Sequence, residues 1–188
     1  SLLIALLSPL LIYLAARIKA DGGPAFFFQK RVGLDAKPFR CMKFRSMHID
    51  AEEQLASMLR DNPALSEEWQ RNHKLESDPR ITSVGKLLRS KSLDELPQLF
   101  NVLLGQMSLV GPRPLIFDEL PRYGKASDLY RLVRPGMTGV WQVSGRSDTT
   151  FEERASMDEW YIRNWSLFYD VTCLIRTINV VLDSDGAY

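Results

Sequence analysis

The chain has 188 residues, of which 45% are apolar and 25% charged, the composition of a folded protein large enough for one domain with its own core. The formal net charge is +1, so the overall charge gives no reason to expect a nucleic-acid partner. The two cysteines, Cys41 and Cys173, are too few for a disulfide framework and favour a reducing compartment.

The chain begins with an apolar run over residues 2–16, interrupted by Ser8 and Pro9 and followed by basic residues. As a helix, this run would reach about 22 Å, short of a hydrocarbon core of roughly 30 Å. A transmembrane anchor and a signal-peptide remnant both remain open. Because Pro9 removes a backbone donor in mid-helix, a broken helix that enters and leaves by the same face is the sharper interpretation. Such a segment would keep Arg17 and Lys19 on the positive, cytoplasmic side.

We therefore predict a re-entrant membrane segment over residues 1–20 and a cytoplasmic domain over 21–188. The start at Ser1, inside an apolar run and without methionine, indicates the C-terminal part of a longer protein. The aromatic residues 26–28 and the basic pair Lys30-Arg31 suit the lipid headgroup boundary.

Apolar spacing and turn residues predict an α+β fold, helix-rich with a small sheet. Short strands are expected over residues 25–33 and 39–44. Helices are expected over 50–60, from Pro63, over 82–90, 94–104, 151–164 and 170–182. The stretch between residue 105 and residue 148 is expected to be rich in loops.

Asp94 and Glu95 open the helix predicted over 94–104. With Asp94 as the N-cap, Pro97 falls in the first turn and the helix dipole favours both anionic forms. An ionised carboxylate there can attack phosphorus or bind a divalent cation, whereas a plain capping motif is the ordinary alternative. Adjacent helical positions diverge by about 100°, so we expect different tasks for the two acids. Gly105 is expected to close the helix.

Two further segments carry cations. Arg113 stands between two prolines, which restrict the backbone and suit bidentate phosphate binding, although an exposed turn is the alternative. Alternation puts Lys43 and Arg45 on one face of a strand, with Phe44 turned into the core. Solvated charges on an edge strand are the ordinary explanation there.

The segment from Arg134 to Gln142 contains two glycines that permit close approach of the backbone to a ligand. Its Trp141 and Gln142 are suited to stack on a base and to hydrogen-bond it.

Taken together, these segments resemble the bacterial sugar transferase family, the monotopic polyprenyl-phosphate phosphoglycosyl transferases. The resemblance covers nearly the whole chain, and its specificity comes from the order and spacing of several motifs. They are Ser8-Pro9, Gln29 to Gly33, Lys43 to Met47, Asp78 to Thr82, Ser92 to Gln98, Met107 to Pro114, Arg134 to Gly139 and Trp165 to Leu167. Residues 141–146 and 185–188 look like those of the undecaprenyl-phosphate galactose phosphotransferases.

The resemblance implies a two-step reaction. Asp94 would attack the β-phosphorus of a UDP-sugar and release UMP, and undecaprenyl phosphate would then take the sugar phosphate from Asp94. Mg²⁺ would lie near Asp94 and Glu95, with Glu95 either a metal ligand or a proton carrier. The expected phosphate-binding residues are Lys43, Arg45, Arg80, Arg89 and Arg113. The expected nucleotide-binding residues are Pro112, Pro114, Arg134, Gly136, Thr138, Gly139 and Gln142, and Asp170 is a further candidate for the site.

The implied donor is UDP-galactose, and UDP-glucose or another UDP-sugar remains open. The implied setting is the cytoplasmic face of the bacterial inner membrane, with the lipid bilayer as a partner and a homodimer as an option. The product would initiate O-antigen, capsule or exopolysaccharide synthesis. A non-catalytic membrane scaffold and a soluble nucleotide-binding module are the alternatives from other classes. The scaffold would not need Asp94, Glu95 and Arg113 together, and release of the protein from membranes by high salt would favour the soluble module.

Overall fold

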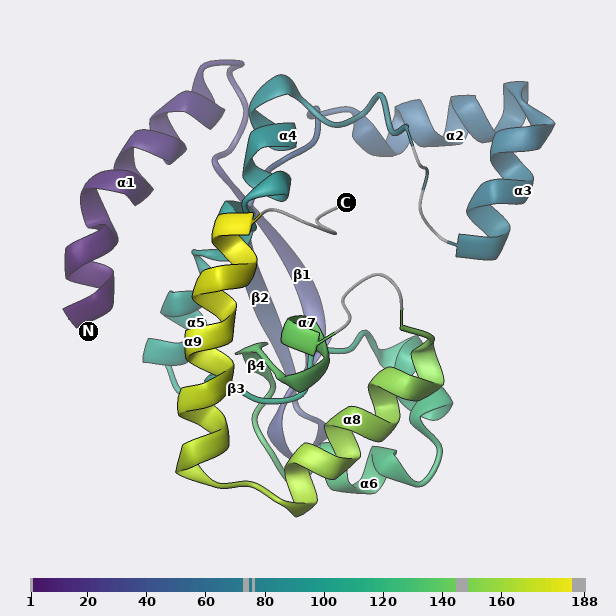
Figure 1. Cartoon of the computed structure of the whole chain (residues 1–188). Coiled ribbons are helices and arrows are strands. Elements are labelled where there is room, and N and C mark those ends of the chain that lie inside the picture. Colours follow the sequence, from purple (N-terminus) through teal and green to yellow (C-terminus); the bar gives the residue numbers. More distant parts are fainter. Residues whose placement is uncertain (1, 73–74, 76, 145–148, 184–188) are drawn as a thin grey trace.

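The computed structural model describes residues 2–72, 75, 77–144 and 149–183 (Figure 1). In chain order its elements are α1 (Leu2–Lys19), β1 (Phe26–Val32), η1 (Leu34–Ala36), β2 (Pro38–Phe44), α2 (Ala51–Asp61), α3 (Pro63–Asn72), α4 (Ser83–Ser90), η2 (Leu93–Glu95), α5 (Gln98–Leu103), β3 (Ser108–Val110), η3 (Phe117–Tyr123), α6 (Ala126–Tyr130), β4 (Gly136–Thr138), α7 (Val140–Ser144), α8 (Phe151–Arg163) and α9 (Leu167–Asp183). Here η denotes a 3₁₀ helix. The predicted α+β class, with a small sheet and an N-terminal apolar helix, is confirmed.

The long hairpin of β1 and β2 runs through the middle of the molecule (Figure 1). Its antiparallel register pairs Gln29 with Cys41 and Phe27 with Lys43. Because side chains alternate along a strand, the odd-numbered residues of both strands share one face, and Arg31 belongs to the same set. This face of the hairpin becomes one wall of the site described below.

A short parallel ladder joins β3 to β4, pairing Ser108 with Gly136 and Val110 with Thr138. The segments that follow β3 and precede β4 approach very closely. A Cβ atom on Gly136 would collide with the backbone nitrogen of Gly111, so glycine is required at this crossing. The ladder thereby brings the chain after Gly136 against the Pro112 segment.

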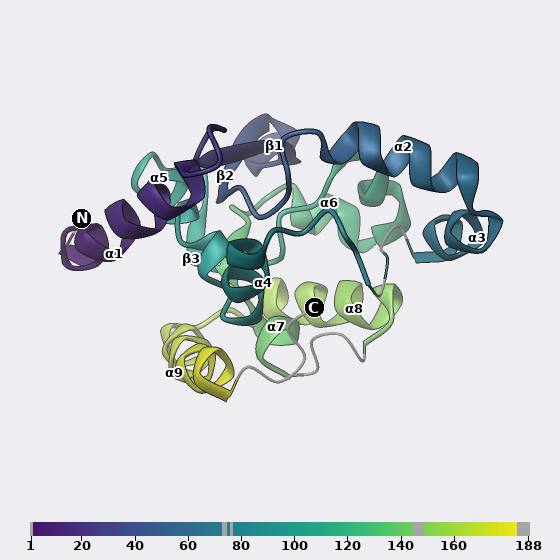
Figure 2. The ribbon, with the colours of Figure 1, turned by 90° about the horizontal axis from the view of Figure 1, so that it is seen from above.

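The C-terminal half of α1 packs on the rest of the fold, since Leu11, Leu14 and Ile18 are buried against Phe44 and Leu88. Its N-terminal half is exposed. Among the described residues, α1 is the one helix long and apolar enough to cross a membrane, by length and composition. Figures 1 and 2 both place α1 at one end of the molecule and the α2–α3 pair at the other.

Pro9 lies inside α1, where the Ser8 side chain makes a hydrogen bond in place of the backbone bond that proline cannot make. Proline lacks the N–H that would bond the carbonyl four residues back, which is that of Ala5. The Ser8 hydroxyl donates to this Ala5 carbonyl at 2.8 Å. The assigned helix is therefore continuous through Pro9, and the re-entrant path remains a prediction.

The helix predicted over 94–104 is wrong in its first part. Asp94 and Glu95 lie in the 3₁₀ turn η2, and α5 begins at Gln98 with Pro97 as its N-cap. The cause is Ser92, the residue before η2, whose left-handed conformation, with φ 52°, turns the chain between α4 and the carboxylates. Asp94 is therefore no helix cap. Gly105 does follow α5 with a positive φ of 71°, as predicted.

The other predicted strands and helices are confirmed within a few residues. The expectation of a loop-rich stretch after residue 105 underestimated the secondary structure there. That stretch holds β3, η3, α6, β4 and α7, each of seven residues or fewer. Elements so short carry little periodicity, and their stability comes from tertiary contacts. Residues 145–148 and 185–188, part of the motifs quoted above, lie outside the described residues.

Candidate active site

A cavity of about 200 Å³ opens where the β1–β2 hairpin, the η2–α5 segment and the Arg113 segment meet α7. Its walls combine three cations with one carboxylate, two amides and an indole. The lining residues are Arg31, Cys41, Lys43, Glu95, Gln98, Arg113, Pro114, Met137, Trp141 and Gln142. The cations and Glu95 come from parts of the sequence that only the tertiary fold brings together.

Glu95 forms an ion pair with Lys43, whose Nζ atom lies 2.6 Å from Oε1 of Glu95. Burial acts to raise the pKa of the Glu95 carboxyl, but the charges of Lys43, Arg113 and Arg31 and the hydrogen bond from Lys43 together outweigh it. They hold the pKa of Glu95 below its ordinary value. Glu95 is therefore an anion in a cationic cavity.

Asp94, its neighbour in the 3₁₀ turn, behaves in the opposite way. Burial and the negative charge of Glu95 raise the pKa of Asp94 to about 6, against the opposing influence of Lys43 and Arg89. The Nε atom of Arg89 donates to the Ser46 hydroxyl at 2.9 Å, which fixes this guanidinium beside the carboxylate turn. Arg89 and Lys43 thus face Asp94 from α4 and from β2.

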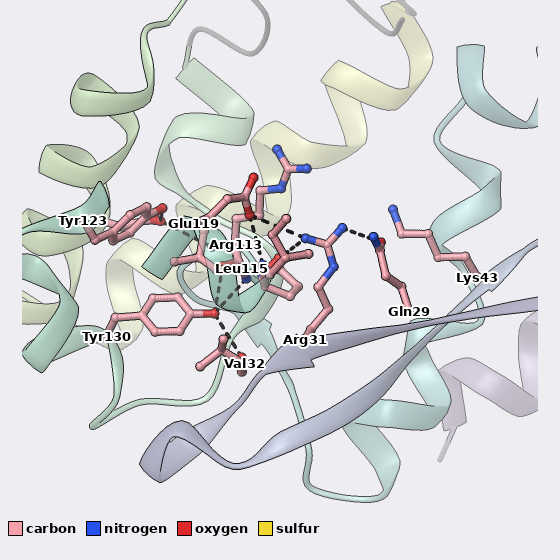
Figure 3. A network of polar contacts seen from close by, with 12 residues as sticks. Gln29, Arg31, Val32, Lys43, Arg113, Leu115, Glu119, Tyr123 and Tyr130 are labelled. Carbon is pink, nitrogen blue, oxygen red and sulfur yellow. Dashed lines mark hydrogen bonds and ion pairs between the residues drawn. The ribbon is translucent and has the colours of Figure 1, made fainter. Parts of the chain in front are cut away.

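Arg31 corrects one expectation. It is 8% exposed and faces the cavity, so it does not lie at a headgroup boundary. Its guanidinium donates to the Pro114 carbonyl at 3.0 Å and to Oε1 of Gln29 at 2.6 Å. Figure 3 shows the contact between Arg31 and Gln29. Glu119 lies 3.7 Å away. The period-two alternation that placed Lys43 would have placed Arg31 on the same wall, had the register of the hairpin been known.

Arg113 reaches the cavity from a segment whose backbone is fully hydrogen-bonded. Its guanidinium carbon lies 5.7 Å from the centre of the Trp141 ring. Its amide donates to Asp158 at 3.4 Å, and its carbonyl lies 3.1 Å from the Tyr130 hydroxyl. Sequence reasoning missed Asp158, because a single acid inside an amphipathic helix carries no signal of its own.

Asp158 is 1% exposed, and burial raises its pKa to about 7. The Tyr123 hydroxyl donates to Oδ2 of Asp158 at 3.0 Å. Gln98 was missed too, although it is 2% exposed and lines the cavity. Its place in the motif that begins at Ser92 was the available signal.

Of the five expected phosphate-binding residues, Lys43 and Arg113 line the cavity, and Arg45, Arg80 and Arg89 do not. All five N–H donors of Arg45 are used by the Asp21 carboxylate and by the carbonyls of Ile18, Pro24 and Met47. Arg45 therefore joins the end of α1 to the hairpin. Two N–H groups of Arg80 bond the buried Asp78 carboxylate at 2.8 and 2.6 Å. We leave Arg45 and Arg80 out of the phosphate-binding set.

Of the seven expected nucleotide-binding residues, Pro114 and Gln142 line the cavity. The others serve the wall behind it or lie elsewhere. Arg134 is exposed and donates to the Gly105 carbonyl at 2.7 Å. Pro112 and Gly136 share a backbone hydrogen bond of 2.8 Å, Thr138 pairs its hydroxyl with Thr177, and Gly139 packs on Gly111.

Asp170 does not line the cavity. It accepts hydrogen bonds from the Tyr161 hydroxyl at 2.7 Å and from the Trp165 indole at 3.2 Å, and so fixes the junction of α8 and α9.

The described residues contain no group of three or more His, Cys, Asp or Glu side chains that would hold a metal on its own. Mg²⁺ is commonly held by one or two carboxylates, with waters and substrate phosphates completing its shell. Asp94 and Glu95 fit this pattern. Their mutual repulsion, which raises the pKa of Asp94, is the kind of strain that a divalent cation relieves.

A carboxylate pair opposed by cations at a cavity is an arrangement suited to an enzyme that transfers phosphorylated groups. The comparison with known families agrees: the family model described as bacterial sugar transferase matches residues 1–184, and the chain belongs to this family.

Three relatives show the range of the family. The chain is 52% identical over 181 residues to the undecaprenyl-phosphate galactose phosphotransferase of Salmonella typhimurium, covering 96% of the chain and 38% of that protein. It is 50% identical over 186 residues to the UDP-galactose-lipid carrier transferase of Erwinia amylovora, covering 99% and 39%. It is 40% identical over 197 residues to the UDP-glucose:undecaprenyl-phosphate glucose-1-phosphate transferase of Klebsiella pneumoniae, covering 100% and 39%. The chain thus spans about two fifths of the length of these relatives.

Proposed function

We propose that this chain is the catalytic part of a phosphoglycosyl transferase that moves galactose 1-phosphate from UDP-galactose to undecaprenyl phosphate and releases UMP. The reaction would initiate the synthesis of a surface polysaccharide. The names of the relatives support the acceptor, and the two that name galactose are about 50% identical, against 40% for the one that names glucose. UDP-glucose is the rival donor, since sugar selectivity can rest on about 1–3 kcal/mol.

The observation that carries the proposal is that the two carboxylates of the pair differ in their contacts. Lys43 engages Glu95 at 2.6 Å, which leaves Asp94 as the acid without an ion-pair contact among the described residues. In the first step Oδ of Asp94 forms a bond to the β-phosphorus of the donor. The bond from that phosphorus to the bridging oxygen breaks, and the oxygen leaves with UMP. Splitting the transfer lets a water-soluble donor and a lipid acceptor use one site in turn.

Arg31, Lys43 and Arg113 line the cavity and would hold the diphosphate of the donor. Arg89, whose charge also acts on Asp94, suits the oxygens of the transferred phosphate. A volume of about 200 Å³ is below the roughly 300–1,000 Å³ of a complete small-molecule site. We therefore assign the cavity to the diphosphate and its nearest neighbours rather than to the whole nucleotide sugar.

Trp141 and Gln142 would receive the nucleoside. Within the described chain, the buried Nε1 of Trp141 and the buried Oε1 of Gln142 have no hydrogen-bond partner. A buried donor or acceptor without a hydrogen bond costs free energy. Binding of a ligand that supplies both missing partners is therefore favoured there. A uracil ring offers both carbonyl oxygens and an N–H.

Asp94 and Glu95 would hold Mg²⁺, which supplies neutralisation of the charge that develops on the transferred phosphate. In the second step an oxygen of undecaprenyl phosphate attacks the same phosphorus, and Asp94 leaves as the free carboxylate.

The packing of α1 supports access of a lipid acceptor. Leu11, Leu14 and Ile18 contact the core cluster that also contains Leu93 and Leu96, on either side of Asp94. A membrane-embedded α1 would therefore hold the carboxylate turn close to the lipid surface. On this proposal the domain works at the cytoplasmic face of the inner membrane, where the positive-inside rule places Arg17 and Lys19.

The test is UMP release by the protein in nanodiscs with undecaprenyl phosphate, Mg²⁺ and a panel of UDP-sugars. We expect release with UDP-galactose, abolished by Asp94→Asn and by EDTA. The matched control is Asp118→Asn, an exposed acid outside the cavity, which should release UMP like the wild type. If UMP is released only with another UDP-sugar, that sugar replaces UDP-galactose as the proposed donor. Full release by Asp94→Asn would remove the covalent step, and no release by folded protein with any sugar would favour a scaffold.

A further inference from the structure

In the segment that carries Arg113, every backbone polar atom from the Pro112 carbonyl to the Leu115 carbonyl lies within hydrogen-bond distance of a partner. Figure 3 shows Arg31 and Tyr130 on either side of it. The Pro112 carbonyl accepts from Gly136, and the Leu115 carbonyl accepts from Val32, each at 2.8 Å. The Pro114 carbonyl accepts from Arg31 at 3.0 Å. The segment is therefore not a mobile loop but a fixed support for one guanidinium.

The two remaining contacts come from side chains buried behind the segment. The Tyr130 hydroxyl accepts from the Leu115 amide at 3.0 Å and lies 3.1 Å from the Arg113 carbonyl. The Asp158 carboxylate accepts from the Arg113 amide at 3.4 Å and from the Tyr123 hydroxyl at 3.0 Å. The Arg113 amide thus bonds an acid, and the Arg113 carbonyl lies within hydrogen-bond distance of a phenol.

We propose that Asp158 is a positioning residue for Arg113: its carboxylate, braced by Tyr123, fixes the amide of Arg113 and so aims the guanidinium into the phosphate cavity. The inference deepens the proposed function and rests on it for its activity measurement. Asp158 does not line the cavity, so it acts through Arg113 and not on the substrate.

A purely structural task would not explain this carboxylate. Asp158 is 1% exposed, and its Oδ1 has no hydrogen-bond partner within the described chain. Burying a charged group that is only partly paired is costly, and an apolar residue of similar volume often serves stability equally well. What the acid adds is a directed acceptor for one amide and, in its ionised form, a negative charge that interacts with the Arg113 guanidinium. Both favour one orientation of that cation.

The experiment is a double-mutant cycle on kcat/KM for UMP release. Asp158→Asn keeps the shape of the side chain and removes its charge, and we expect kcat/KM to fall about 10- to 100-fold, as for a misplaced catalytic contact. In an Arg113→Ala background the same substitution should change kcat/KM by less than about twofold. The loss in Asp158→Asn should also appear in the same constant, kcat or KM, as the loss in Arg113→Ala. Equal losses in both backgrounds would overturn the proposal.

Two controls separate positioning from folding. Leu120→Ala removes a buried contact from the same core cluster without touching a hydrogen bond to the segment, and should lower the Tm but keep kcat/KM. Tyr123→Phe removes the hydroxyl that braces Asp158, so a smaller loss should again vanish in the Arg113→Ala background. It replaces Asp158→Asn in the cycle if that variant does not fold.

Binding of UDP distinguishes a failure of this inference from a failure of the proposed function. If the wild type binds UDP but releases no UMP, the proposed reaction is wrong, and the cycle is repeated on the Kd for UDP. Weaker binding by Asp158→Asn, absent in the Arg113→Ala background, supports the positioning. Unchanged binding in both backgrounds overturns it.

Discussion

Lys43 and Glu95 lie 52 positions apart in the sequence, and their side chains meet at 2.6 Å between Nζ and Oε1. The contact joins the hairpin wall of the cavity to the carboxylate turn. It favours the ionised form of Glu95. The two charges also act on the pKa of Asp94, which Glu95 raises and Lys43 lowers. The first prediction concerns this pair.

Replacing Lys43 by Met should lower kcat/KM for UMP release by about 100-fold, the effect of removing one charge-stabilising donor from a transition state. The cavity loses one of its cations, and the Glu95 carboxyl loses its ion pair. Lys30→Met, an exposed position on the other face of the same hairpin, is the matched control and should remain close to the wild type. A Lys43→Met variant as active as this control would contradict a role for the pair.

Asp158 should make the free energy of unfolding depend on pH. Burial raises its pKa from 3.8 to about 7, so the folded state holds the proton more tightly than the unfolded state. The stabilising contribution is complete below about pH 4 and is lost as the pH rises through 7, amounting to about 4 kcal/mol at most. Burial and the Asp158 charge raise the pKa of Tyr123, so its hydroxyl does not titrate in this window.

The measurement compares urea unfolding of the wild type and of Asp158→Asn in detergent between pH 4 and pH 8. As the pH rises, the free energy of unfolding of the wild type should fall relative to that of Asp158→Asn. Curves that stay parallel over this window would show that Asp158 does not titrate there.

Ser92 carries backbone strain, because its φ of 52° lies in the left-handed region that L-residues disfavour. A β-branched side chain fits this conformation worse than serine does, so Ser92→Val should lower the free energy of unfolding by about 1–2 kcal/mol. Ser92→Gly should be close to neutral, since glycine relieves the strain but loses more chain entropy on folding.

The same substitution should reduce UMP release, since the Ser92 turn directs the two carboxylates that follow it. Ser90→Val, two residues earlier at the end of α4, is the control for the size of the side chain. A larger loss of stability in Ser90→Val than in Ser92→Val would contradict the assignment of strain to residue 92.

Ser8 and Pro9 act together in α1, because the Ser8 hydroxyl bonds the Ala5 carbonyl that Pro9 cannot bond. Pro9→Ala restores the backbone N–H, which should straighten the helix and favour a path across the bilayer over the predicted re-entrant path. A cysteine placed at Leu3 should then become accessible from the opposite side of the membrane. The native Cys41 and Cys173 are buried and should give little background labelling.

In the parent carrying Pro9, the cysteine at position 3 should react only from the cytoplasmic side. Cytoplasmic labelling that is identical with and without Pro9→Ala would show that proline does not determine the topology. Labelling of the parent from the opposite side would overturn the re-entrant prediction itself.

The hairpin strands, α4, α8 and the apolar α1 follow from local pattern, because each is long enough for its periodicity and end signals to be seen in the sequence. Asp94, Glu95, Lys43 and Arg113 also stand out locally, as acids beside a proline, a cation in an alternating strand and an arginine between prolines. The family resemblance rests on the same residues, and the family match confirms it.

Only the tertiary structure decided which cations share the cavity. Arg45 and Lys43 stand on the same face by alternation, yet the Asp21 carboxylate and three backbone carbonyls take all the donors of Arg45, whereas Lys43 pairs with Glu95. Arg31 and Asp158 acquire their places from partners 83 and 45 positions away, Pro114 and Arg113. The physical reason is that an N–H or a carboxylate bonds whichever acceptor or donor the folded chain brings within about 3 Å, and sequence spacing does not encode that distance.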